Sequence, residues 1–482
     1  MENYTAKTKY DPDMPSNELD NIHFSKDKFT KSFIKLAICS IIGILVFFVS
    51  VPHNGESEII FSIIYNWLVG LMGNFAYWVI TLIVGGNLFA HIYFKYIKKG
   101  KCQSAFADVY QNDNLIHTFL YTIGFIYVFL YAMKMNIPGF VGPEFIVGDA
   151  TGGSVVPPIV LGVLGIILVG AIFMPFLLNY GILEIVGALL EPLMRPLFKV
   201  PGKAALDAVA SFVSSSSLGV LITNRLWKKN AYTDKEMVAI MTGFSAVSIG
   251  FAYLVINTAN LGHLFLKIYA ISFVLVFIME MIMVRIPPIS RKKNTYFNGR
   301  EQTEEERKEG AKLSLSLFKI GFNRAVKRAG ISNSIKKDMK LSLKDSFLIL
   351  PQVLTMLSAI GVSALILAEY TPLFQWLGNI FKPLLMLCQV PDINLIAPSI
   401  PVGIAEMFLP VLVMGTKISI ISEPARVFVT LVSIVQIIFF SETATVMLAT
   451  KSPIKFWEII VCFLERTVIA IPLAALVIHF LF

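Results

Sequence analysis

Long apolar runs separated by short polar segments dominate the pattern of this chain. Each run is close to the roughly 20 residues that an α-helix needs to cross the hydrocarbon core of a bilayer. We expect nine membrane-spanning helices, at residues 32–51, 75–94, 115–133, 159–178, 237–257, 264–284, 347–368, 424–448 and 456–482. The first thirty residues are polar, so no cleavable signal peptide is expected before the first span.

Composition and charge agree with this pattern. Of 482 residues, 56% are hydrophobic and only 15% are charged, which is typical of a protein whose solvent is the bilayer. The net charge of +9 comes mostly from loops, notably residues 95–101 and 285–344. Basic loops mark the cytoplasmic side, so the charge predicts orientation, with the N-terminus inside, and no binding of nucleic acid. The long loop also contains an amphipathic stretch expected to lie along the inner leaflet.

One apolar segment, FVSSSSLGVLITN at residues 212–224, contains four consecutive serines. If residues 203–224 crossed the membrane fully, the basic RLWKKN that follows would lie outside, against the positive-inside rule. A re-entrant hairpin at 203–224 is therefore predicted. The hydroxyls of Ser214, Ser215, Ser216 and Ser217 would line the path of a polar solute; alternatively, they bond to carbonyls of their own helix or allow close helix packing.

The second half of the chain repeats this plan. GALLEPLMRPLFKVP at 187–201 resembles GNIFKPLLMLCQVP at 378–391, and a second interrupted apolar segment, PSIPVGIAEMFLPVLV, follows at 398–413. The two copies begin after helices that run in opposite directions, which indicates an inverted repeat with a second hairpin at 392–414. The expected fold class is an all-α polytopic membrane protein with about nine spans plus two re-entrant helical hairpins. Matching interrupted segments in two halves point to a binding site near the membrane midplane.

Polar side chains inside apolar runs are the candidates for chemistry. Glu406 and Glu442 are carboxylates at membrane depth, suited to proton coupling, sodium ligation or capture of a substrate hydroxyl or ammonium group. Protonated or paired structural roles are the alternative. The predicted substrate-binding residues are Ser214, Ser215, Ser216, Ser217, Glu406, Gln436 and Glu442. The candidates for ion coupling are Asp207, Ser245, Ser248, Glu406 and Glu442.

Other reactive residue types give no site. The four cysteines and six histidines are scattered singly, so no metal site and no disulfide framework is predicted. No nucleophile–base pair emerges, so we expect neither an enzyme nor a cofactor beyond a coupling sodium ion or proton. Glu465 and Arg466 in the last span are interpreted as structural, pairing with neighbouring helices.

Two regions carry a resemblance to a known family. SFVSSSSLGVLITNRLWKKNAYTDKEMVAIMTGFSAVSIGF at 211–251, and PSIPVGIAEMFLPVLV together with RVFVTLVSIVQIIFFSETATVML at 426–448, resemble the two halves of YjiH-type membrane proteins. The resemblance implies nucleoside-recognition (gate) domains, a location in the bacterial inner membrane, and a repeat related to concentrative nucleoside transporters. It places any family site at residues 214–217, Glu406 and Glu442. It also allows, as partners, a second copy of the chain or another gate-domain membrane protein.

The expected organisation and function follow from these points. The predicted parts are a cytoplasmic tail (1–30), N-terminal helices (31–157), a first gate repeat (158–284), a basic amphipathic cytoplasmic linker (285–345) and a second gate repeat (346–482). We expect a secondary active transporter of a small polar solute, a nucleoside, amino acid or small peptide, coupled to sodium or protons by alternating access. The alternative is a non-transporting gate-domain scaffold or assembly subunit.

Overall fold

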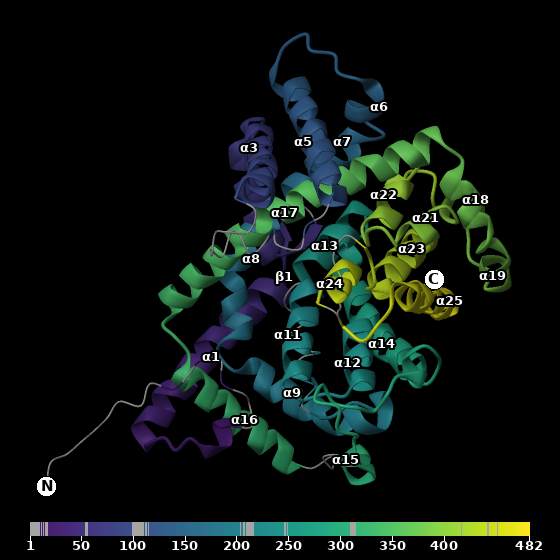
Figure 1. Ribbon diagram of the computed structural model, residues 1–482. Helices are drawn as coiled ribbons and strands as arrows, with labels where there is room; N and C mark the ends of the chain where they lie inside the picture. The colour runs from purple at the N-terminus through teal and green to yellow at the C-terminus, as the bar shows by residue number, and fades with distance from the viewer. Residues whose placement is uncertain are drawn as a thin grey trace, which may run out of the picture.

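A computed structural model gives the arrangement of the chain (Figure 1). It describes residues 18–53, 56–98, 115–202, 216–244, 249–308, 315–415, 417–440, 443–450 and 452–482, with residues 10, 12, 14, 110, 113, 204, 205, 208 and 247. Helices make up most of this part of the chain, and one two-stranded antiparallel hairpin accompanies them.

The N-terminal half begins with helices of very different lengths. Its elements are η1 (Glu18–Asn21), α1 (Lys26–Phe48), β1 (Ser50–His53), β2 (Glu56–Ile59), α2 (Ile60–Met72), α3 (Phe75–Ile92), η2 (Tyr93–Ile97), α5 (Leu115–Asn136), α6 (Glu144–Val147), α7 (Gly152–Val155), η3 (Val156–Leu161) and α8 (Gly162–Leu178). There follow α9 (Ile182–Leu193), η4 (Met194–Phe198), α11 (Ser216–Lys228), α12 (Asp234–Gly243), α13 (Ile249–Thr258), η5 (Gly262–Leu264) and α14 (Phe265–Met283).

The C-terminal half contains the longest helix and several of the shortest. Its elements are η6 (Ile289–Arg291), α15 (Glu304–Lys308), α16 (Leu315–Ile331), α17 (Ile335–Tyr370), α18 (Leu373–Asn379), α19 (Lys382–Leu387), α20 (Ile393–Ile396), α21 (Ser399–Val402), α22 (Leu409–Gly415), α23 (Glu423–Gln436), α24 (Thr443–Ala449) and α25 (Phe456–Leu481). At 1.5 Å per residue, the 36 residues of α17 extend about 54 Å. Figure 1 shows α17 crossing the molecule, with α3 and α5 on one side and α13 and α22 on the other.

Seven helices of the described chain are long and apolar enough to cross a membrane. The prediction of an all-α membrane protein is therefore confirmed. Two predicted continuous spans, 237–257 and 424–448, were wrong: the first is divided into α12 and α13, and the second into α23 and α24. Both interruptions lie where serine, threonine or glutamate enters the apolar run, in GFSAVSIG and QIIFFSET. Side chains of this kind give the backbone alternative hydrogen-bond partners.

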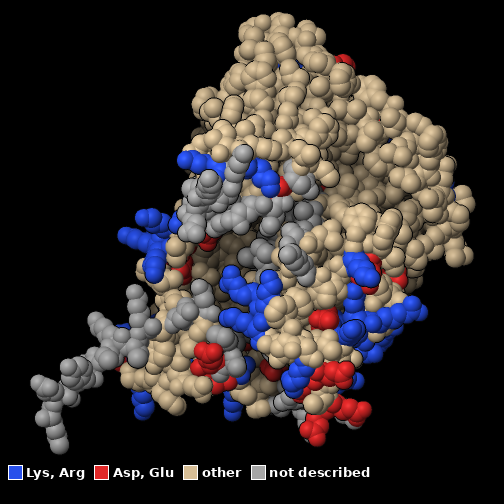
Figure 2. Space-filling model, in the orientation of Figure 1, with Lys and Arg blue, Asp and Glu red and all other residues tan. Residues whose placement is uncertain are grey.

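The linker packs against other helices, because α16 lies against α9 and α1. Arg328 on α16 forms an ion pair of 2.7 Å with Glu184 on α9, and Arg324 pairs with Asp20 at 2.6 Å. Figure 2 shows charged side chains concentrated on the lower part of this face, around the linker, while the upper part is almost free of charge. That separation is expected of a membrane protein with its charged loops on one side.

Candidate functional site

The two interrupted helices end at comparable points in their repeats. In the first, α12 ends at Gly243 and α13 begins at Ile249; in the second, α23 ends at Gln436 and α24 begins at Thr443. Each interruption removes backbone groups from the helical ladder. Such groups are tolerated at membrane depth only where the protein or water in a cavity satisfies them. The partners of these groups therefore define the site.

At the second break, backbone amides donate to a side chain of the broken helix itself and to a carbonyl of a neighbouring loop. Ile437 adopts a left-handed conformation, with φ of 47°, and this residue stops α23. The amide of Phe439 donates to Oγ1 of Thr443 at 3.0 Å, and the amide of Phe440 donates to the carbonyl of Ile404 at 2.8 Å. A left-handed β-branched residue is unfavourable by itself, so these bonds must stabilise the turn.

Ile404 belongs to the second predicted hairpin, which the structure places directly against this break. The hairpin consists of α20 and α21, a turn at 403–408, and α22. Glu406 lies in that turn and is only 4% exposed. Ser433 on α23 donates from Oγ to the carbonyl of Met407, next to Glu406. The turn that carries the predicted carboxylate is thus fixed to the interrupted helix.

Gln436, the last residue of α23, connects three elements. Its Nε2 donates to the carbonyl of Ile400 at 3.3 Å and to Oγ1 of Thr467 on α25 at 2.9 Å. Its Oε1 is buried and has no hydrogen-bond partner among the described residues. That oxygen lies against Gly403, three residues before Glu406, where an added Cβ would approach it to 2.0 Å. The structure therefore brings Gln436 to the hairpin turn that contains Glu406.

The first hairpin is only partly described. Ser216 and Ser217 form the start of α11, whereas the other predicted residues of this region and of the two breaks lie outside the described residues: Ser214, Ser215, Asp207, Ser245, Ser248 and Glu442. Farther along α11, Nδ2 of Asn224 donates to the carbonyl of Thr450, just after α24, at 3.3 Å.

Helix contacts connect the first half of this region to the second. The helix α11 of the first hairpin lies against α24, the second half of the second broken helix. Conversely, α22 of the second hairpin lies against α13, where the rings of Phe251 and Phe408 are 5.9 Å apart. Each interrupted helix is therefore in contact with a helix from the other half of the chain.

Local backbone geometry also matches between the repeats. Lys199 and Gln389, each immediately before a Val-Pro pair, have positive φ angles of 56° and 51°. In both copies the amide of the following valine turns back to a helical carbonyl, that of Met194 or that of Leu385. The chain therefore leaves α9–η4 and α18–α19 by the same left-handed turn, on the motif that suggested the repeat.

Two buried charges beside the breaks were missed as a pair in the sequence. Arg466 on α25 and Glu280 on α14 are both fully buried, and the guanidinium lies 3.6 Å from the carboxylate. Arg466 also donates to the carbonyl of Thr242 at 3.1 Å and to that of Val435 at 2.9 and 3.3 Å. One signal in the sequence could have revealed this pair: the apolar run 264–284 contains a single carboxylate, and a charge inside a membrane segment usually has a partner.

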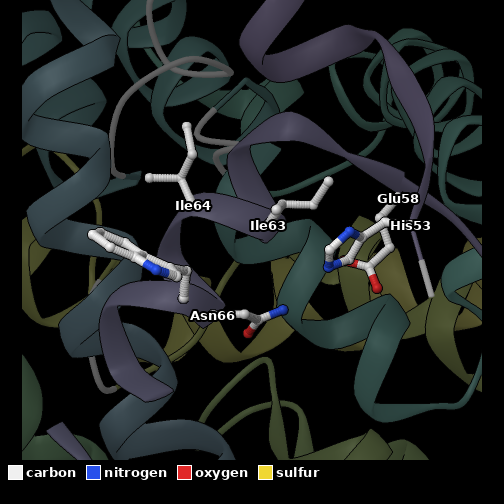
Figure 3. A pocket seen from close by; sticks show the side chains of 6 residues that line it. His53, Glu58, Ile63, Ile64 and Asn66 are labelled. Carbon is white, nitrogen blue, oxygen red and sulfur yellow. The ribbon is translucent and has the colours of Figure 1, made fainter. Parts of the chain in front are cut away.

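A separate hollow of about 490 Å³ lies at the β-hairpin (Figure 3). His53 and Glu58 line it from the strands, and Ile63, Ile64 and Asn66 line it from α2. Among the described residues, none of those predicted for the site borders this hollow, so it is distinct from the region of the breaks.

Comparison with known proteins gives a family. Residues 160–262 match the family described as Gate, nucleoside recognition. The chain is 36% identical over 343 residues to the uncharacterized protein BpOF4_10220 of Alkalihalophilus pseudofirmus, which covers 71% of this chain and 73% of that protein. A shorter stretch of 97 residues is 35% identical to the sporulation integral membrane protein YlbJ of Bacillus subtilis, covering 18% of this chain and 23% of that one.

Solved structures give weaker similarity. The structure of CNTnw in an inward-facing substrate-bound state is 13% identical, with 94% of this chain and 97% of that chain covered and a TM-score of 0.42. A doubly substituted CNTnw in an outward-facing state gives a TM-score of 0.40 at 12% identity, covering 94% and 99% of the two chains. On the extent of its sequence identity to the Alkalihalophilus protein and its Gate match, the chain belongs to the family of YjiH-type membrane proteins with nucleoside-recognition (gate) domains.

Proposed function

We propose that this protein is a secondary transporter that moves a small polar solute by alternating access, coupled to sodium or protons. The single observation that carries the proposal is the pair of interrupted helices, each in contact with a helix from the other half of the chain. Transporters of this design bind their solute where broken helices expose backbone groups near the midplane. A purely structural membrane protein has no need to interrupt two helices at matching places.

The polar groups at the second break suit a small neutral or cationic solute. Gln436 Oε1 is a buried acceptor without a hydrogen-bond partner among the described residues, and Glu406 is a buried carboxylate in the adjacent turn. A buried acceptor that lacks a donor costs free energy, which a ligand donor recovers on binding. We assign Glu406 to the solute or to the coupling ion, and Gln436 to the solute. A nucleoside, an amino acid or a small peptide offers the required donors.

Thermal unfolding of the purified full chain tests this proposal. Nucleosides, amino acids and dipeptides are screened with sodium or potassium at several pH values. A solute present at one hundred times its dissociation constant stabilises the folded state by about 2.7 kcal/mol. We expect one solute class to raise the unfolding midpoint of the wild type but not of Glu406→Gln.

Glu423→Gln is the matched control, because Glu423 is a more exposed carboxylate, 36% accessible, in the same repeat. It should keep the solute response. If no solute in the panel stabilises either protein, the transporter proposal fails and a non-transporting gate-domain scaffold takes its place. If Glu406→Gln keeps the response of the wild type, the solute binds at a site away from the second hairpin.

A further inference from the structure

Arg466 binds the ends of both broken helices. Thr242 and Val435, whose carbonyls accept from its guanidinium, are each the last but one residue of their helix, in α12 and α23. The two helices come from different repeats, and α25 lies beside both breaks through this one side chain. A single residue therefore contacts the same structural position in each repeat.

These carbonyls need a donor because the helices stop. In a continuous helix the carbonyl of Val435 would accept from the amide of Phe439. Here that amide donates to Thr443 instead, and a guanidinium nitrogen of Arg466 takes its place at 2.9 Å. Arg466 thus replaces a helical hydrogen bond that the break removes.

Charge favours the same arrangement. The C-terminal end of a helix carries roughly half a negative charge, so two such ends face the guanidinium, together with the carboxylate of Glu280. Glu280 reaches this position because Gly243 leaves room: a Cβ there would come within 2.0 Å of the carboxylate. The fixed cation is matched by negative charge from three elements, which permits its complete burial.

We propose that Arg466 is a resident cation at the junction of the two broken helices, occupying the position at which such helix ends otherwise bind a metal cation. It holds the ends of α12 and α23 together, so that they form one body across the two repeats. A coupling ion, where one is used, then binds elsewhere, and Glu406 is the described candidate assigned to it. Only this last point rests on the proposed transport function.

Hydrogen exchange of the purified full chain, measured without any solute, tests whether Arg466 holds the ends of α12 and α23 together. In Arg466→Gln we expect exchange to rise by about tenfold or more in both break segments, 237–250 and 430–445, since each loses a charge-assisted bond. Arg466→Lys keeps the positive charge but lacks the planar set of guanidinium N–H donors. It should therefore show more protection of both segments than Arg466→Gln, but less than the wild type. Exchange in α3 and α5 should not change.

Arg285→Gln is the matched control, because Arg285 also donates to backbone carbonyls, those of Leu197, Pro196 and Met281, none of which lies at the end of α12 or α23. It should leave both segments protected. Loosening of one segment alone, or equal loosening in the control, would overturn the proposal. Because no solute is added, failure here is distinguishable from failure of the proposed transport function.

Chemical rescue tests the cation itself. Millimolar guanidinium should raise the unfolding midpoint of Arg466→Ala, whereas urea, its neutral analogue, should not. Neither compound should raise the midpoint of the wild type. Equal responses to guanidinium and urea would contradict the assignment. If Arg466→Ala does not fold, Arg466→Lys provides the test: it keeps the buried charge but not the planar set of donors, so both break segments should lose part of their protection, and a loss in one segment alone would overturn the proposal.

Discussion

The two broken helices share one anchor and differ in their others. Both end on carbonyls that Arg466 binds. The first is fixed near its start, where Glu236 on α12 pairs with Arg195 and accepts from Gln302 of the linker at 2.8 Å. The second is fixed near its end, where the hairpin turn at 403–408 accepts from Ser433 and from the amide of Phe440.

This difference separates the contact that both broken helices share from the contacts that only one of them makes. The shared cation satisfies a requirement that any interrupted helix has, namely a donor for the carbonyls left at its end. The other anchors are specific: one connects the first helix to the linker, and the other connects the second helix to a hairpin. Changes at the shared anchor should therefore alter both breaks, and changes at the specific anchors only one.

The largest effect is expected for Arg466→Met. Removing one partner of a buried ion pair leaves an uncompensated charge and destabilises proteins by about 3–5 kcal/mol. We expect a loss of this size in the free energy of unfolding, measured with denaturant in detergent. Adding Glu280→Gln should recover part of it, because no buried charge then remains unpaired. A loss below about 1 kcal/mol, the range of exposed pairs, would contradict the pairing.

An effect on the second break alone is expected for Gly403→Ala. The added Cβ would lie 2.0 Å from Oε1 of Gln436, so the side chain and the hairpin turn must move. Overpacking of this kind costs about 1–3 kcal/mol. The measurement is the unfolding free energy, with hydrogen exchange to locate the change to 430–445. Gly415→Ala is the control: among the described residues its Cβ would meet no atom within 4 Å, so the stability should stay nearly the same.

A smaller effect is expected for Thr443→Val. The substitution preserves shape but removes the hydroxyl, which accepts from the amide of Phe439 and donates to the carbonyls of Ile437 and Phe439. Each lost hydrogen bond costs about 1 kcal/mol, and the loss is seen as a lower unfolding midpoint. Thr430→Val is the control, because its hydroxyl donates to the carbonyl of Arg426 in the same helix and therefore holds no break. Equal losses in the two variants would show that Thr443 does not hold the break.

The smallest effect is expected in the linker that joins the two repeats. The side chain of Arg300 and the amide of Thr303 lower the pKa of Glu306 below its usual value by hydrogen bonding to its carboxylate. A lowered folded-state pKa stabilises the fold above the unfolded pKa, and this contribution is lost as the pH falls through the folded value. Glu306→Gln should thus lower the midpoint slightly at neutral pH; the difference should shrink as the pH falls below the unfolded value of about 4.3 and vanish below the lowered folded pKa. Protection of either break should not change; if it does, the linker is coupled to the site.

The site could be predicted only in part. Glu406 and Gln436 were singled out as candidates because polar side chains are costly inside apolar runs. The two residues lie close together because the second hairpin packs against α23. The repeated Pro- and Gly-rich motif predicted that hairpin, but not which residues it would contact. The breaks in α12–α13 and α23–α24 were missed, because hydropathy averages over a window and a few polar residues leave an apolar run intact.

The apolar runs by themselves determined that this protein is a helical membrane protein, because each is long enough to span a bilayer and no soluble core needs so many. Only the tertiary structure decided which polar groups meet. Arg466 was interpreted as a residue that pairs with a neighbouring helix, but the sequence could not name Glu280, Thr242 and Val435 as its partners. Two of these partners are backbone carbonyls, which carry no sequence signal and become available only where a helix ends.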